Sequence, residues 1–120
     1  MPIDDLLAKY SQEIRDLTLA AHTLILECFP QALEQVDLPS HLLAYGTSAK
    51  YADTVFTLMP QVKWVNLGIY SALELPDPHA LLQGTGKLHR HVKIHKLMDL
   101  KSPVLHDLLQ AAVKRKMKSG

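Results

Sequence analysis

Residues 62–70 read VKWVNLGIY, and this segment decides the fold. Its two sets of alternate residues differ in character, which is typical of a β-strand because successive side chains point to opposite faces. We expect the mostly apolar face to pack against a helix. That face consists of Val65, Leu67 and Ile69. Trp64 and Tyr70 share the other face, which we expect to be only partly covered.

Other segments predict strands around this one. Residues 54–59 are rich in β-branched and apolar side chains and lie only a short break away, so the two segments predict an antiparallel hairpin. Residues 31–51 indicate extended segments interrupted by Pro39, which fits an edge or bent strand. Residues 90–95 alternate as a further strand. The inward-facing residues of that strand are expected to be Val92 and Ile94.

Helices are predicted at both ends of the chain. Apolar residues recur at three- and four-residue spacing over residues 3–28, which predicts one long helix ending before Pro30. Ser102 and Pro103 are typical of a helix start, and an apolar stripe follows them. Residues 1–120 are therefore expected to form one α+β domain. Its small, mostly antiparallel sheet would carry the N- and C-terminal helices on one face.

A short helix is expected over residues 78–83, between the predicted strands. Asp77 would be its N-cap and Pro78 would occupy its first turn. Gly84 is a natural C-terminal glycine for such a helix. On this interpretation Gly84 and Gly86 form a helix cap followed by a turn.

The segment Gly84–Lys87 also allows an anion site. Two glycines permit close approach to a ligand, their amides can hold an anion, and Lys87 adds positive charge. A nucleotide-binding phosphate loop is not expected, because that motif needs a hydroxyl residue after the lysine and a helix after the loop. Here Leu88 takes the hydroxyl position, and a predicted strand follows.

A row of histidines follows the glycines. His89, His91 and His95 occupy odd positions of the predicted strand, together with Lys93, so they share one face. His89 and His91 would lie about 7 Å apart, and both could reach one zinc or iron ion. Interleaved cations would repel a metal, however, and these cations are Lys87, Arg90, Lys93 and Lys96. A solvated polar face or an anion site therefore fits this row better than a metal site.

Composition narrows the function classes. The chain has 120 residues, of which 48% are hydrophobic, as in ordinary globular proteins. A net charge of +1 gives no global field that would recruit nucleic acid or an anionic membrane. The basic string KRKMK near the end has no aromatic platform beside it, so nucleic acid is not expected as a partner. No segment predicts a signal peptide or a membrane span, and we expect a soluble cytoplasmic protein.

No motif in the sequence argues for an enzyme. Cys28 is the single cysteine, and it ends an apolar stripe as a core residue would. His22 falls near the edge of that stripe, where a core or boundary histidine is the expected role. Neither a nucleophile elbow nor a paired-carboxylate motif is present. We therefore expect a binding protein rather than a catalyst.

Four strings resemble the YdhG-like family, a domain of unknown function. They are Trp64–Tyr70 (WVNLGIY), Leu75–Pro78 (LPDP), Leu82–Lys87 (LQGTGK) and Arg90–Lys93 (RHVK). The resemblance runs over most of the chain and implies an α+β fold close to that of frataxin. Some YdhG-like proteins are regarded as frataxin-like iron chaperones. An iron site carried over from that resemblance would use carboxylates of the first helix, which are Asp4, Asp5, Glu13 and Asp16.

The leading hypothesis is a small non-enzymatic binding domain without a cofactor, whose ligand is an anion, a small molecule or an acidic protein partner. The alternative hypothesis is an iron chaperone that uses the carboxylates of the first helix. The sequence leaves the oligomeric state open. The residues predicted to bind the ligand are Gly84, Gly86, Lys87, Arg90, His91 and Lys93, with Trp64 and Tyr70 nearby.

Overall fold

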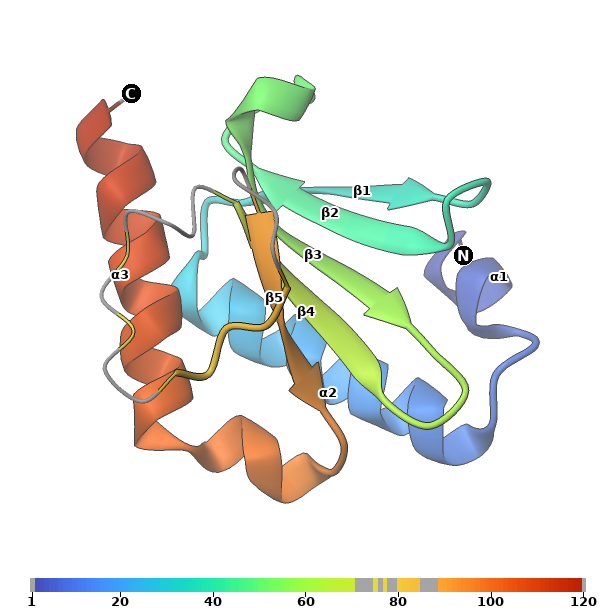
Figure 1. The fold of residues 1–120 in the computed structure, drawn as a ribbon. Coiled ribbons are helices and arrows are strands. Elements are labelled where there is room, and N and C mark those ends of the chain that lie inside the picture. Colours follow the sequence, from blue (N-terminus) through green and yellow to red (C-terminus); the bar gives the residue numbers. More distant parts are fainter. Residues whose placement is uncertain (1, 71–74, 76, 78–79, 85–88, 120) are drawn as a thin grey trace.

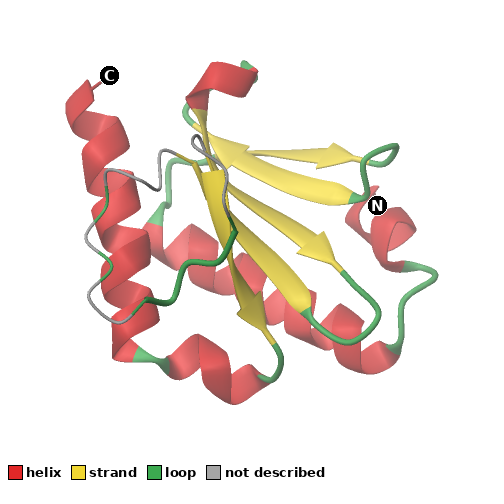
Figure 2. Ribbon diagram, in the orientation of Figure 1, coloured by secondary structure: helices red, strands yellow, loops and turns green. Residues whose placement is uncertain are grey.

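A five-stranded antiparallel sheet forms one layer of the molecule, and α-helices cover one of its faces (Figure 1, Figure 2). The computed structural model describes residues 2–70, 75, 77, 80–84 and 89–119. The prediction of an α+β fold with terminal helices on a small antiparallel sheet is confirmed. None of the helices in these residues is long and apolar enough to cross a membrane.

The strands follow one another across the sheet in chain order. They are β1 (Leu33–Asp37), β2 (Leu42–Gly46), β3 (Thr54–Pro60), β4 (Val65–Tyr70) and β5 (His89–Ile94). Each strand pairs antiparallel with the next, so the predicted hairpin of β3 and β4 is confirmed, with Leu58 opposite Leu67. Pro39 lies in the turn between β1 and β2, where its missing N–H costs no sheet hydrogen bond. β1 is the strand at one edge of the sheet. β5 is the last strand at the other edge, where Gln83 forms an isolated antiparallel bridge with His91 of β5.

The prediction that a strand begins at Val62 is wrong by three residues, because β4 starts at Val65. A tight turn occupies the intervening positions, where the N–H of Gln61 donates to the carbonyl oxygen of Trp64 at 2.8 Å. Val62 stands at this turn with 83% of its surface exposed. The apolar side chain of Val62 fits the alternation of the strand, although Val62 belongs to the turn. The prediction therefore began the strand too early.

The prediction of one helix over residues 3–28 is also wrong. The chain forms α1 (Pro2–Leu7) and then α2 (Gln12–Cys28). Ser11 separates them in an extended conformation, and its hydroxyl accepts a hydrogen bond from the N–H of Ile14 at 3.2 Å as an N-cap. The apolar periodicity runs through the break because α1 also buries its apolar residues, Leu6 and Leu7.

The C-terminal helix begins where the sequence predicts. α3 spans Pro103–Ser119, and the hydroxyl of Ser102 accepts from the N–H of Leu105 at 3.3 Å. Two short 3-10 helices were not predicted, η1 (Tyr51–Asp53) and η3 (Leu97–Lys101). His95 and Lys96 join β5 to η3, and the carboxylate of Asp99 accepts from the N–H of His95 at 2.8 Å at this junction.

The predicted short helix over residues 78–83 is not present at residues 80–83, and residues 78 and 79 lie outside the described part of the chain. Ala80 adopts a left-handed conformation with φ of 53°, which a helix cannot contain. The carboxylate of Asp77 accepts from the N–H of Leu81 at 2.9 Å and of Leu82 at 3.0 Å. Asp77 thus caps a loop whose last part pairs with β5, instead of starting a helix.

The core lies between the sheet and the helices α2 and α3. It includes the apolar face predicted for β4 and the two inward residues predicted for β5, and both predictions are confirmed. These residues are Val65, Leu67, Ile69, Val92 and Ile94. Opposite them, α2 buries Leu17, Ala21 and Ile25, and α3 buries Leu105 and Leu109. Strand alternation therefore leaves a second set of side chains on the face away from these helices.

His22 stands at the edge of this core, as expected for a boundary histidine. Its Nδ1 lies 2.9 Å from the hydroxyl of Tyr45, a fully buried residue. The same nitrogen lies 2.6 Å from Oε2 of Glu34 on β1. Burial, followed by the contact with Glu34, raises the pKa of Tyr45 far above its ordinary range. Tyr45 is thus a neutral buried phenol. The contacts of His22 with Tyr45 and Glu34 connect α2 to β2 and β1.

Candidate functional site

The sheet face away from α2 and α3, which we call the open face, gathers the chemically distinctive side chains. Its members on and beside β4 and β5 are Trp64, Asn66, Gly68, Tyr70, His89, His91 and Lys93, flanked by Tyr51 and His95. The register places β4 and β5 residues of this face in direct pairs, such as Asn66 with Lys93 and Gly68 with His91. Residues far apart in sequence are therefore neighbours here.

One end of the open face is built around Trp64. The indole Nε1–H donates to Oδ1 of Asn66 at 2.8 Å, which fixes the ring beside β4. The ammonium of Lys93 lies 4.8 Å from the indole centroid, a cation–π contact, and the His95 ring lies 6.3 Å away. Lys93 has no ion pair within the described residues. Its charge is thus held at a defined place and remains available to an anion.

The other end of the open face is an aromatic stack. The rings of Tyr70 and His89 are stacked, with centroids 4.9 Å apart, and Tyr51 meets Tyr70 edge-on at 5.4 Å. Burial and the hydrogen bond with Tyr51 raise the pKa of Tyr70 to about 12. The Tyr70 ring is thus in contact with two other rings, so this end of the face supplies an aromatic wall more than a free stacking platform.

His91 lies between these two ends. Its backbone pairs with Gln83, whose N–H donates to the His91 carbonyl at 2.7 Å. Next to Gln83, Gly84 has a φ of 103°, and a Cβ there would lie 3.6 Å from His91 Nδ1. Burial lowers the pKa of His91, and the charges of Lys93 and His89 lower it further. The lowered pKa favours the neutral form of the His91 ring, which has one N–H to donate and one nitrogen to accept.

The electrostatics of this region are one-sided. β3, β4 and β5 contain neither aspartate nor glutamate, whereas β5 contains two histidines, an arginine and a lysine. A cation would meet no carboxylate on these three strands. The arrangement can therefore bind a negative group.

The structure brings together only part of the predicted ligand site. Trp64, Tyr70, His91 and Lys93 share the open face, as proposed from the strand periodicity. Arg90 is opposite the buried Ile69 and so lies on the helix-covered side of the sheet. Gly84 stands at the edge beside His91, and Gly86 and Lys87 lie outside the described residues.

The carboxylates of the alternative iron site are spread over two helices. Asp4 and Asp5 belong to α1, and Glu13 and Asp16 belong to α2. The carboxylate of Asp16 accepts a hydrogen bond from the Gln12 amide at 2.7 Å. Among the residues that the structure describes, no group of three or more histidine, cysteine, aspartate or glutamate side chains is placed to hold a metal ion.

Two residues of the open face were missed in the sequence. Alternation along the strand places Asn66 on the same face as Trp64. The strand pattern could therefore have predicted Asn66 as the acceptor for the indole N–H. Tyr51 had no such signal. It reaches Tyr70 because η1 directly precedes β3, and only the folded sheet places it there.

Comparisons with protein-family models, with curated proteins and with solved structures give no match to this chain.

Proposed function

We propose that this chain is a non-enzymatic binding domain and that its open face holds a small anion at Lys93. The observation that carries the proposal is the charge arrangement of β3, β4 and β5. A lysine is held over the single tryptophan and stands between two histidines, and these strands contain no carboxylate. A positive charge held on strands that carry no carboxylate is an ordinary basis of anion recognition.

The neighbours of Lys93 support this proposal by restricting its side chain. The Trp64 indole attracts the ammonium, and Asn66 anchors the indole through its N–H. His91 is two residues from Lys93 along β5, about 7 Å in an extended strand, and His95 follows directly after the end of β5. Their imidazole N–H groups can donate to the oxygen atoms of an anion that the ammonium holds. The expected ligand is therefore an oxyanion, such as a phosphate or a carboxylate.

The wider identity of the chain also remains a proposal. The YdhG-like resemblance and its frataxin-like fold are compatible with an α+β architecture, and we propose membership on the strength of the quoted strings. We propose a cytoplasmic location, because a chain with a single cysteine suits a reducing compartment. An acidic protein that presents a carboxylate to Lys93 would use the same chemistry as a free anion.

The proposal can be tested through the emission of Trp64, because it is the only tryptophan. Inorganic phosphate and then pyrophosphate would be titrated against sodium chloride at matched ionic strength. We expect saturable changes in emission with the oxyanions only, together with a raised melting temperature. In Lys93→Ala the affinity should fall about tenfold, as for the loss of a charge-assisted hydrogen bond.

Lys63→Ala is the matched control, because Lys63 is an exposed lysine in the turn between β3 and β4. It removes the same charge from the molecule without touching the Trp64 ring contact. If Lys93→Ala and Lys63→Ala weaken the response equally, net charge explains the binding and the proposed site is wrong. An equal response to chloride would contradict the proposal in the same way.

A further inference from the structure

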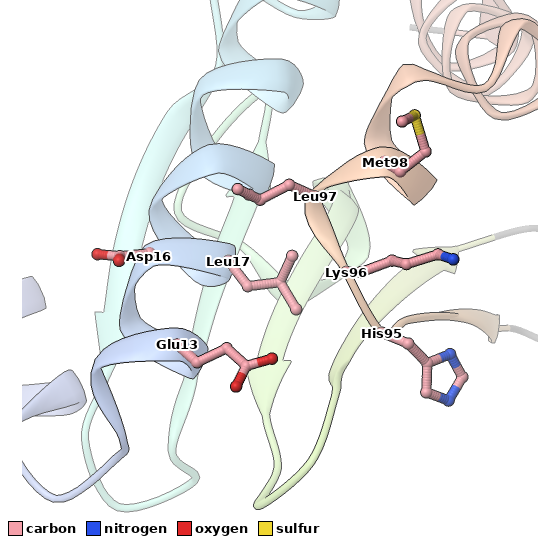
Figure 3. A pocket seen from close by; sticks show the side chains of 7 residues that line it. All are labelled: Glu13, Asp16, Leu17, His95, Lys96, Leu97 and Met98. Atoms are coloured by element: carbon pink, nitrogen blue, oxygen red, sulfur yellow. The ribbon is translucent and has the colours of Figure 1, made fainter.

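A second concave site lies between the first half of α2 and the segment that joins β5 to η3, and it borders the open face at His95 (Figure 3). Its volume is about 400 Å³. That value falls within the range of about 300–1,000 Å³ of small-molecule pockets. The lining residues are Glu13, Asp16, Leu17, His95, Lys96, Leu97 and Met98. The pocket is therefore large enough for one small organic molecule.

The pocket is apolar at its centre. Leu17 from α2 points into it and Leu97 from η3 extends toward α2 on the other side (Figure 3). Leu97 is 54% exposed and Met98 is 65% exposed, so two large apolar side chains beside the pocket face solvent. Covering this surface would remove apolar area from water, which favours binding of an apolar body.

The charge that faces the pocket is negative. The carboxylate of Glu13 points into the pocket, whereas the Asp16 carboxylate points away from it and is held by Gln12 (Figure 3). Lys96 and His95 also line the pocket, but the Lys96 ammonium and the His95 ring point outward (Figure 3). Glu13 has neither a hydrogen bond nor an ion pair in the described part of the chain. An apolar cavity with one inward carboxylate fits an organic cation.

We propose that this pocket binds a small amine with an apolar body, whose ammonium pairs with Glu13 and whose body packs between Leu17, Leu97 and Met98. An apolar body alone would gain only the hydrophobic contribution. An apolar anion would meet the Glu13 carboxylate, which repels it. The ligand class therefore differs from that of the open face, although His95 borders both sites.

Phenylethylamine is a suitable probe, with 2-phenylethanol and 3-phenylpropionate as neutral and anionic probes of similar size. Methyl resonances of Leu17, Leu97 and Met98 would be followed by NMR during each titration. We expect saturable shifts with the amine, about tenfold weaker binding of the alcohol, and the weakest binding for the carboxylate.

Glu13→Gln should weaken amine binding about tenfold and bring it close to that of the alcohol. Glu13 is exposed, so this variant should fold normally. Glu27→Gln is the matched control, because Glu27 is an exposed carboxylate on the same helix that does not line the pocket. Equal amine affinity in wild type and Glu13→Gln would overturn the proposal. So would carboxylate binding as tight as amine binding, or methyl shifts confined to residues outside the pocket.

Discussion

The two faces of the sheet are built from the same strands, but different interactions hold the side chains of each face in place. On the helix-covered face, Leu67, Ile69 and Val92 are held by burial, and each contributes by removing apolar surface from water. On the open face, the alternate positions carry Asn66, Tyr70 and other polar or aromatic groups that contact one another at the surface. Stability thus resides mainly in one face, which leaves the other free to carry a binding site.

This contrast predicts the largest loss of stability when a buried side chain of β4 is shortened. Leu67→Ala should lower the free energy of unfolding by about 2–5 kcal/mol, because Leu67 is fully buried and its loss leaves a cavity. The neighbouring change Asn66→Ala, on the open face, should cost only about 1 kcal/mol through loss of the Trp64 hydrogen bond. Urea denaturation of both variants measures the difference. An equal loss of unfolding free energy in the two variants would contradict the claim that stability resides mainly in the helix-covered face.

The next largest effect concerns two glycines that a methyl group would crowd in different ways. A Cβ at Gly46 would overlap the backbone carbonyl of Asp53, which cannot yield, so Gly46→Ala should cost about 1–3 kcal/mol. A Cβ at Gly68 would overlap only the hydroxyl of Thr57, which can rotate away. Gly68→Ala should cost less, and adding Thr57→Ala should restore part of the loss. Thermal unfolding of the three variants tests this order.

A smaller effect is expected where a polar group is buried on the helix-covered side. Tyr45→Phe removes the hydroxyl that contacts His22 and leaves the Glu34 carboxylate without the phenol, at a cost of about 1–2 kcal/mol. Denaturant unfolding at neutral pH measures this cost. His22→Gln should cost less, because His22 is only partly buried. A neutral or stabilising Tyr45→Phe would mean that the three side chains do not secure α2 to the strands.

The smallest effect is a pH dependence on the open face. The folded-state pKa of His91 is lowered, so the unfolded chain binds a proton first as the pH falls below the ordinary value of about 6.5. Stability should therefore decline slightly as the pH falls from about 6.5 to the folded-state pKa, and no further below it. Lys93→Ala should raise the His91 midpoint in an NMR titration, because Lys93 is one cause of the lowering. Lys101→Ala, in the exposed part of η3, should leave it unchanged.

Much of the fold was predictable because alternation and helix periodicity record burial directly. The buried faces of β4 and β5 and the start of α3 at Pro103 follow from local patterns alone. The break at Ser11 was not predictable from periodicity, because Leu6 and Leu7 of α1 are buried like the residues of α2. The apolar pattern favours one continuous helix, whereas the Ser11 side chain favours a helix start. Here the helix starts after Ser11.

The candidate sites were less predictable than the fold. Trp64, Tyr70, His91 and Lys93 were correctly grouped because they alternate on neighbouring strands. Tyr51 and the pocket of Glu13 and Leu97 depend on the packing of elements that no local pattern relates. Arg90 was grouped with the ligand residues by its charge, although strand alternation already assigned it to the other face.

The most direct test of the open face as a binding surface is a map of backbone and indole NMR shifts during titration with inorganic phosphate. Anion binding at Lys93 predicts saturable shifts at Lys93, His91, Asn66 and the Trp64 indole N–H, with no change at the basic end of α3. Shifts centred on Lys114–Lys118, or shifts that chloride reproduces at equal ionic strength, would contradict it.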